Sequence, residues 1–263
     1  MIRSALMNVM TAAALKAGRG LKRDFGEVEN LQVSIKGPGE FVTAADKRAE
    51  KVLFEELSRA RPGYGFVMEE GGQVEGSDRT HTWHIDPLDG TTNFLHGIPL
   101  FAISVGLERE GQIVAGLIYN PAHDEMYVAE RGAGAFLNNR RLRVAQRRDI
   151  ADAVVATGIP HLGKAREHGQ FKAELAAIMA RVGNVRRLGA AALDLAYLAG
   201  GRYDAYWERG LKTWDMAAGL LLVREAGGYV TDLDGGSDML GKGHLVAGNE
   251  TMMRKTYDLL RAA

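Results

Sequence analysis

The nine residues DPLDGTTNF, from Asp86 to Phe94, combine residue types that can carry out chemistry. Two aspartates stand three positions apart, a proline follows the first, and a glycine with two threonines follows the second. Asp, Pro and Gly are also the usual residues of surface turns, so a plain turn is the competing interpretation. Like charges repel, however, and two carboxylates this close favour a site in which a cation lies between them.

Further carboxylates occur where the expected helices and strands begin or end. Each is next to hydrophobic sequence, so each is expected at the edge of a core rather than on a free loop. The positions are Asp46, Glu69, Glu70, Asp86, Asp89 and Asp215. Oxygen ligands without histidine or cysteine are typical of hard cations, and Mg²⁺ accepts them while it keeps several waters. The carbonyl oxygen of Leu88 is a further, neutral candidate ligand.

The Gly-Thr-Thr segment supplies the features of a phosphate site. Gly90 allows the backbone to approach an anion closely, and Pro87 stiffens the turn before it. If a helix starts here, the N–H groups of Gly90, Thr91 and Thr92 are free and the helix dipole attracts a phosphate. The Thr91 hydroxyl could orient a water molecule. Cations beside a phosphate site make hydrolysis of phosphate esters the expected reaction.

These residues must be positioned by elements of the N-terminal half. Apolar spacing over residues 2–14 predicts an amphipathic helix rather than a signal peptide. Residues 32–35 are typical of a short strand, 36–40 of a loop, and 44–59 of a helix that Thr43 caps. Two further strands are expected over 66–70 and 81–86.

From Phe101 the pattern becomes β-rich, and a break at Glu110 and Gly111 predicts an antiparallel hairpin. Strands are expected over 101–110, 112–120, 126–130, 134–138, 154–159, 185–187, 204–208, 229–233 and 245–249, and helices over 167–182, 190–198, 213–227 and 250–261. This mixture indicates a layered α/β or α+β fold. A weak boundary near 146–150 divides the chain into an N-terminal half, 1–145, and a closely packed C-terminal half, 146–263.

The composition excludes several classes of protein. The 263 residues include 33 basic and 33 acidic side chains, a formal net charge of +0, so no bulk field favours nucleic acid or an anionic membrane. The absence of cysteine excludes disulfides and thiolate zinc sites and fits a reducing cytoplasm. No apolar run approaches the roughly 18 residues that a membrane helix needs. We therefore expect a cytoplasmic protein without membrane contact.

Three segments resemble the signatures of the inositol monophosphatase family, whose members are Mg²⁺-dependent, Li⁺-sensitive phosphatases. Residues 83–94, WHIDPLDGTTNF, resemble its first signature, and residues 214–228, WDMAAGLLLVREAGG, resemble its second. Residues 36–50, KGPGEFVTAADKRAE, resemble a third element, and the glutamates at 69–70 fall where the family has Gly-Glu-Glu. Two long signatures in the right order are far more specific than a lone short motif.

The resemblance implies a layered α/β/α/β/α sandwich with mixed sheets, usually as a homodimer. It also implies two or three Mg²⁺ ions. Glu69, Asp86 and the Leu88 carbonyl would hold the first ion, and Asp86, Asp89 and Asp215 the second. Glu69, together with water, would bind a third, weaker ion.

The same resemblance assigns roles in catalysis and substrate binding. Thr91, hydrogen-bonded to Asp46, would help to activate the attacking water, and Glu69 belongs to the same catalytic group. The implied substrate contacts are Gly90, Thr91, Glu208, Gly189, Ala190, Ala191 and Lys36. Water held by one ion would attack phosphorus in line while the other ion stabilises the leaving alkoxide, without a covalent intermediate.

Some positions depart from the family pattern. Met68 replaces a small residue before Glu69, His84 stands where the family favours an aliphatic side chain, and Gly39-Glu40 replaces a different pair. None of them removes an implied ligand. The departures therefore bear on substrate fit more than on activity.

Three functions remain open at this stage. The leading hypothesis is hydrolysis of myo-inositol 1-phosphate or a similar sugar phosphate, because Thr92-Asn93 after Gly-Thr is the form of the inositol phosphatases. Fructose-1,6-bisphosphatase or another small phosphomonoesterase is the alternative. Some bacterial relatives instead act in RNA-related regulation through partner proteins. A basic cluster offers a weak signal for a nucleic-acid or transcription-machinery partner: Arg140, Arg141, Arg143, Arg147 and Arg148.

Overall fold

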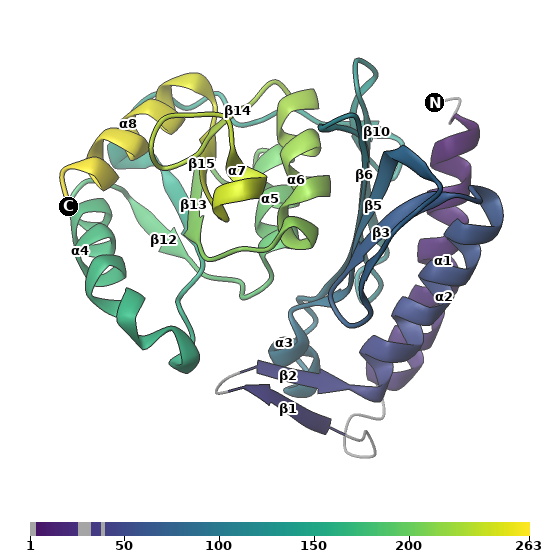
Figure 1. The fold of residues 1–263 in the computed structure, drawn as a ribbon. Helices are drawn as coiled ribbons and strands as arrows, with labels where there is room; N and C mark the ends of the chain where they lie inside the picture. Colours follow the sequence, from purple (N-terminus) through teal and green to yellow (C-terminus); the bar gives the residue numbers. More distant parts are fainter. Residues whose placement is uncertain (1–3, 26–32, 38–39) are drawn as a thin grey trace.

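A computed structural model describes residues 4–25, 33–37 and 40–263, and its elements stack in five layers (Figure 1). The outer layer on the N-terminal side consists of α1 (Ala5–Phe25) and α2 (Ala44–Ala60). Thr43 ends the strand before α2 and caps the helix, because its hydroxyl oxygen accepts from the backbone N–H groups of Ala45 and Asp46. The expected helices and cap are confirmed.

An eight-stranded sheet forms the second layer, in the order β10-β9-β8-β7-β6-β5-β3-β4. The strands are β3 (Tyr64–Met68), β4 (Gly72–Val74), β5 (Asp78–Asp89), β6 (Ala102–Arg109), β7 (Gln112–Asn120), β8 (Glu125–Glu130), β9 (Gly134–Leu137) and β10 (Arg140–Arg141). Only the β3–β5 pair among them is parallel. The expected hairpin is confirmed, and its turn residues Glu110 and Gly111 both have positive φ, 51° and 77°.

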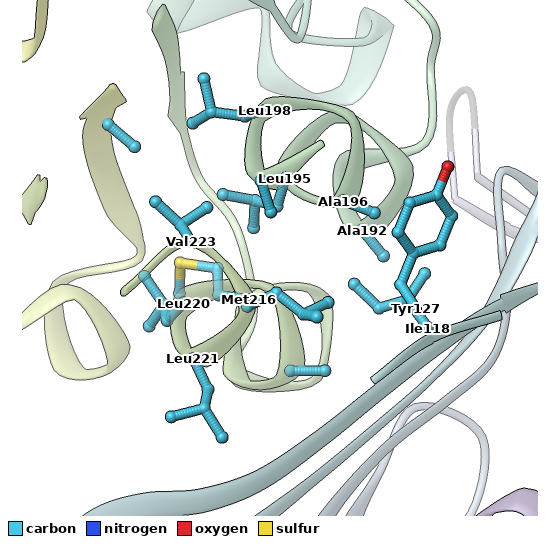
Figure 2. Packing of buried hydrophobic residues seen from close by; sticks show 14 of the residues in the cluster. Ile118, Tyr127, Ala192, Leu195, Ala196, Leu198, Met216, Leu220, Leu221 and Val223 are labelled. Atoms are coloured by element: carbon cyan, nitrogen blue, oxygen red, sulfur yellow. The ribbon is translucent and has the colours of Figure 1, made fainter. Parts of the chain in front are cut away.

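The central layer consists of α5 (Ala191–Ala199) and α6 (Thr213–Glu225), which lie between the two sheets (Figure 1). Figure 2 shows Leu195 and Leu198 of α5 with Met216 and Leu220 of α6, and Ile118 and Tyr127 of the eight-stranded sheet face them. Helix α6 approaches the sheet closely because β6 has a glycine there. A Cβ at Gly106 would lie 2.7 Å from Cβ of Ala217.

A five-stranded sheet forms the fourth layer, in the order β12-β11-β13-β15-β14. Its strands are β11 (Val154–Thr157), β12 (Asn184–Arg186), β13 (Ala205–Arg209), β14 (Tyr229–Thr231) and β15 (His244–Gly248). Helices α4 (His168–Met179) and α8 (Glu250–Arg261) cover its outer face (Figure 1). The layered α/β/α/β/α sandwich with mixed sheets is therefore confirmed.

Several short elements were not expected. The segment 36–40 is wrong as a loop, since β1 (Val33–Gly37) and β2 (Glu40–Thr43) extend into it and pair antiparallel. The additional short elements are the strands β4 and β10, the helices α3 (Thr91–Leu95) and α7 (Met239–Lys242), and the 3₁₀ turns η2 (Ile150–Asp152) and η3 (Leu162–Glu167). Gln32, at the start of the first expected strand, and Gly39 lie outside the described residues.

The boundary near residue 146 falls between the two sheets in the sequence, since β10 ends at Arg141 and β11 begins at Val154. Helix α6 nevertheless belongs to the C-terminal half and packs on the N-terminal sheet. The division into 1–145 and 146–263 stays a prediction. Among the described residues, no helix is long and apolar enough to cross a membrane.

Candidate active site

The opening motif lies at the end of β5, where an irregularity places two aspartates near each other. In a regular strand, positions three apart point to opposite faces. The pairing of β5 with β6 shifts register between Asp86 and Asp89, and Pro87, which has no N–H to give to a ladder, lies within the shift. The Asp86 carboxylate accepts from the N–H of Leu88 at 2.9 Å, which fixes the bend.

Two other carboxylates reach the same end of the sheet from different elements. Glu69 follows β3, which runs parallel to β5, and its N–H donates to the carbonyl of Ile85 at 3.2 Å. Asp215 lies in the first turn of α6, where its carboxylate accepts from the N–H of Lys212 at 2.7 Å. A parallel strand pair and the start of one helix therefore bring together acids that are up to 146 positions apart (Glu69 to Asp215).

Burial and mutual repulsion raise the pKa values of these acids. The pKa of Asp86 is raised well above its ordinary range by burial first and then by Glu69, Asp89 and Asp215. The pKa of Asp89 is raised well above its ordinary range by burial and then by Asp215, and that of Asp215 is raised to about 7, mainly by burial. A side-chain hydrogen bond with Glu69 raises the pKa of Asp86 further. The acids therefore repel one another, and a cation between them would relieve this repulsion.

These acids offer the right donor atoms for a hard cation, but not yet a closed ligand shell. In the part of the chain that the structure describes, no three His, Asp or Glu side chains stand in a group that could hold a metal ion as they are. Asp89 instead accepts from the N–H of Ala192 at 2.7 Å. Carboxylate oxygens that repel one another match Mg²⁺ in chemistry. The ligand set of Glu69, Asp86, Leu88, Asp89 and Asp215 remains a proposal.

Thr91 and Asp46 make the contact that the family resemblance implies. The Thr91 hydroxyl lies 3.2 Å from Oδ1 of Asp46 and 3.1 Å from the carbonyl oxygen of Leu88. Asp46 is fully buried, and its other oxygen accepts from the N–H of Thr43 at 2.9 Å. Burial raises the pKa of Asp46, although the bonds from Thr43 oppose the shift. A raised pKa makes this carboxylate a better proton acceptor.

Gly90 turns the chain from β5 into the five-residue helix α3 and has a φ of 88°. A Cβ at this position would lie 2.9 Å from the carbonyl oxygen of Leu100. The left-handed backbone and the close approach both require glycine here. Gly90 and Thr91 therefore present their backbone to the space in front of the carboxylates.

A cavity of about 480 Å³ opens in front of the cluster. The expected site residues that line it are Glu69, Asp89, Gly90, Thr91, Gly189, Ala190, Ala191, Glu208 and Asp215. Asp46 and Asp86 lie buried behind this wall, as does Leu88. The backbone of Lys36 lies in β1, but its side chain is outside the described part of the structure, so its expected contact stays a prediction.

Glu208 forms the far wall of the cavity, on β13. The Tyr206 hydroxyl donates to its carboxylate, and burial raises the pKa of Glu208 to about 7. A Cβ at Gly158 would lie 1.8 Å from the Glu208 carboxylate, so only glycine leaves room for it. Behind this wall Asp194 is buried without a hydrogen-bond partner among the described residues, and burial and Glu208 raise its pKa well above the ordinary range.

Three basic residues that the sequence did not single out also line the cavity: Lys164, Arg187 and Lys212. The Lys164 ammonium donates to the carbonyl of Gly210 at 2.7 Å, and Arg187 folds over Gly189. Their approach depends on the strand order β12-β11-β13, which no local pattern reveals. Lys212 lies two residues before the second signature, and this was the one feature of the sequence that could have indicated its place in the site.

The raised pKa values predict how the stability of the metal-free protein changes with pH. Asp215 and Glu208 have pKa values of about 7 in the folded protein, whereas unfolded carboxyls titrate near 4. Between these values the folded protein binds more protons, so the free energy of unfolding falls as pH rises from about 4 to about 7, by up to roughly 4 kcal/mol for each of the two groups. Above pH 7 these two groups add no further change.

Urea unfolding across this pH range, with EDTA or with Mg²⁺, measures the effect. Mg²⁺ should reverse the trend, because the cation competes with protons for the same carboxylates. A stability profile in EDTA that is flat or rises between pH 5 and pH 7 would contradict the assignment.

Comparison with known proteins places the chain among related sequences and structures. The profile described as the inositol monophosphatase family matches residues 3–263. The chain is 66% identical over 254 residues to the inositol-1-monophosphatase of Mesorhizobium japonicum, with 97% of this chain and 95% of the relative covered. It is 44% identical over 243 residues to Nus factor SuhB of Vibrio cholerae, with 92% and 90% covered. The crystal structure of extragenic suppressor protein suhB from Bartonella henselae superimposes with a TM-score of 0.95 at 58% identity, and covers 98% of this chain and 99% of that one.

Proposed function

This chain belongs to the inositol monophosphatase family, and we propose that it is a phosphatase that hydrolyses myo-inositol 1-phosphate or a closely similar sugar phosphate. The observation that carries the proposal is the convergence of Glu69, Asp86, Asp89 and Asp215 beside Gly90 and Thr91. The carboxylates are complementary to cations, and the backbone of Gly90 and Thr91 is complementary to a phosphate. Glu208 lines the same cavity. Hydrolysis by a general acid and a general base without cations would not require four mutually repelling acids.

Each residue would contribute a defined part of the reaction. Glu69, Asp86, the Leu88 carbonyl, Asp89 and Asp215 would hold two or three Mg²⁺ ions. When bound, Mg²⁺ would neutralise phosphate charge and lower the pKa of water. The backbone N–H groups of Gly90 and Thr91 would orient the phosphate.

The Thr91 hydroxyl would position the attacking water. Because its hydrogen points to Asp46 or to the carbonyl of Leu88, its lone pairs are available to accept a hydrogen bond from water. A proton leaving the water could then pass through the hydroxyl to Asp46, whose raised pKa suits it to accept one. Glu208 and the turn at Gly189, Ala190 and Ala191 would hold the alcohol part of the substrate.

A phosphate-release panel tests this function directly. The panel contains myo-inositol 1-phosphate, glucose 1-phosphate, glycerol 2-phosphate and fructose 1,6-bisphosphate, each with Mg²⁺ and with EDTA. We expect Mg²⁺-dependent release with inositol phosphate among the best substrates. Absence of turnover for all four compounds, from protein that is folded, would refute the proposal.

Glu208→Gln is expected to separate recognition of the alcohol from the chemical step. Glutamine keeps the size of the side chain but loses the charge that accepts hydroxyl groups, so KM for inositol phosphate should rise roughly 10–100-fold. Turnover of p-nitrophenyl phosphate, whose leaving group has no hydroxyls, should change by less than about threefold. An equal loss for both substrates would show that Glu208 acts in the chemistry or in the fold instead.

The basic residues of the cavity support a second substrate. Lys164, Arg187 and Lys212 line the cavity together with the acids, and a neutral polyol does not need them. A second phosphate would be complementary to these charges. Fructose 1,6-bisphosphate in the panel tests this alternative, and a kcat/KM above that for inositol phosphate would make it the preferred substrate.

A regulatory role is the third candidate, because a relative is named Nus factor SuhB. All five arginines of the basic cluster are exposed, although Arg147 also pairs with the buried Asp204 at 3.1 Å. The cluster is thus accessible to a nucleic-acid or transcription-machinery partner. Co-purification of such a partner that is lost in Arg140→Ala/Arg143→Ala would support this role.

We also propose that the protein is cytoplasmic, as the lack of cysteine suggests, and that it forms a homodimer, as the family resemblance implies. Sedimentation velocity measures the oligomeric state. Li⁺ inhibition of phosphate release tests the family property that is expected of the ion sites.

A further inference from the structure

A second cavity, of about 590 Å³, lies at the opposite end of α6 from the catalytic pocket. Trp214 and Asp215, in the first turn of α6, line the catalytic pocket, whereas Leu221 and Arg224, near its end, line the second cavity. The turn of the β6–β7 hairpin and helix α7 complete its walls. The volume falls within the range of small-molecule sites.

The carboxylates that line this cavity are engaged with the protein. Glu108 lies 3.0 Å from Nε2 of His84. Glu225 accepts from the N–H groups of Gly132 and Gly134, both at 2.8 Å. Asp238 caps α7 and accepts from the N–H of Gly241 at 3.0 Å. The three carboxylates of the lining therefore already have hydrogen-bond partners within the protein.

The two arginines of the cavity are different. Arg131 donates to the side-chain oxygen of Gln112 and has no carboxylate partner in the described residues. The guanidinium of Arg224 has neither a hydrogen bond nor an ion pair within the described part of the chain, and burial and the charge of Arg131 lower its pKa. Two guanidinium groups that line one cavity and have no carboxylate partner among the described residues are complementary to an anion.

We propose that this cavity binds a small organic anion. A phosphate, carboxylate or sulfonate group would lie between Arg131 and Arg224. The apolar part of the ligand would contact Leu220, Leu221 and Met239, which line the same cavity. The required ligand is thus amphipathic and differs from the polyol phosphate of the catalytic pocket.

A chain of contacts connects this cavity to the catalytic pocket, and this step rests on the proposed function. Glu108 contacts His84, and Nδ1 of His84 lies 2.9 Å from the Thr213 hydroxyl, two residues before Asp215. His84 is buried and touches both groups. An anion beside Glu108 is therefore expected to shift the start of α6 and, with it, Asp215. By linkage, Mg²⁺ should change the affinity for the anion by the same factor.

Anilinonaphthalenesulfonate is a suitable probe, because it combines a sulfonate with an apolar body and fluoresces when bound. We expect one saturable site in the wild-type protein. Arg224→Ala and Arg131→Ala should each weaken binding roughly tenfold or more, and Arg224→Lys by less. Arg254→Ala, an exposed arginine of α8, is the matched control and should bind as the wild type does. Thermal unfolding verifies that each variant is folded.

Two results would overturn the proposal. One is unchanged probe affinity in the Arg131→Ala/Arg224→Ala double variant. The other is complete competitive displacement of the probe by myo-inositol 1-phosphate, the polyol phosphate of the catalytic pocket, which would place the probe in that pocket instead. The coupling has its own measurement: probe affinity should change severalfold when Mg²⁺ is added, and His84→Val should remove this change while the probe still binds. No effect of Mg²⁺ on wild-type affinity would refute the coupling, even if phosphate release is normal.

Discussion

Replacing Asp89 by asparagine is expected to lower kcat/KM for inositol phosphate by roughly 10³-fold, since several kcal/mol of transition-state stabilisation depend on the cations that it would help to hold. The structure supports so large an effect because Asp89 lies between two groups of acids. The pKa of Asp89 is raised by burial and then by Asp215, and the charge of Asp89 in turn raises the pKa of Asp86. Asparagine keeps the shape and its carbonyl can still accept from the N–H of Ala192, but it removes the charge.

The same change should stabilise the protein in EDTA, because it relieves repulsion that no cation compensates. Opposite effects on activity and on the free energy of unfolding are the signature of a metal ligand. Calorimetric titration with Mg²⁺ and urea unfolding measure both quantities. Asp258→Asn, an exposed aspartate on α8, is the matched control. If Asp89→Asn bound Mg²⁺ and turned over substrate like the control, the proposed ligand set would be wrong.

Thr91→Val is expected to lower kcat by roughly 10²–10³-fold with little change in KM, because valine has the shape of threonine but cannot hold or deprotonate water. The hydroxyl is within hydrogen-bonding distance of both Asp46 and Leu88, so its loss leaves a buried carboxylate with one partner fewer. The pH dependence of kcat should also lose the limb that reports Asp46.

Stopped-assay phosphate release across a pH series measures this effect. Thr251→Val, on the outer helix α8, controls for the loss of a threonine hydroxyl. Thr91→Ser should recover much of the activity, since serine restores the hydroxyl. A Thr91→Val enzyme with an unchanged pH profile and less than a tenfold loss would show that the hydroxyl only holds the turn between β5 and α3 in place.

Most of the fold followed from local patterns. The bounds of α8, Glu250–Arg261, coincide with the expected helix, because Asn249 and the last basic residue mark its ends. The Thr43 cap and the Glu110-Gly111 hairpin were likewise visible, since both depend on neighbours in sequence. Helix α3 was missed as an element because five residues give no periodicity, although its first N–H groups were considered.

The site was predictable where chemistry and sequence distance coincide. The close spacing of Asp86 and Asp89, two like charges, indicated a cation site. The family resemblance indicated the roles of Asp215 and Glu208. Lys164 and Arg187 were not predictable as site residues. Only the parallel pairing of β11 with β12 and β13 brings the segments that carry them to the cavity. The closeness of Gly158 to Glu208 depends on the same register.

The catalytic pocket is assembled from two sheets with different tasks, and this has an evolutionary consequence. Asp46 belongs to α2, and Glu69, Asp86 and Asp89 belong to the eight-stranded sheet and its loops. Gly158, Arg187 and Glu208 belong to the five-stranded sheet and its loops. Mutations that drift through the second group can change which alcohol is accepted while the hydrolytic apparatus stays intact. With such a division, a few loop substitutions would suffice to change the accepted alcohol, while Asp215 on α6 would have to keep its place because it belongs to both parts.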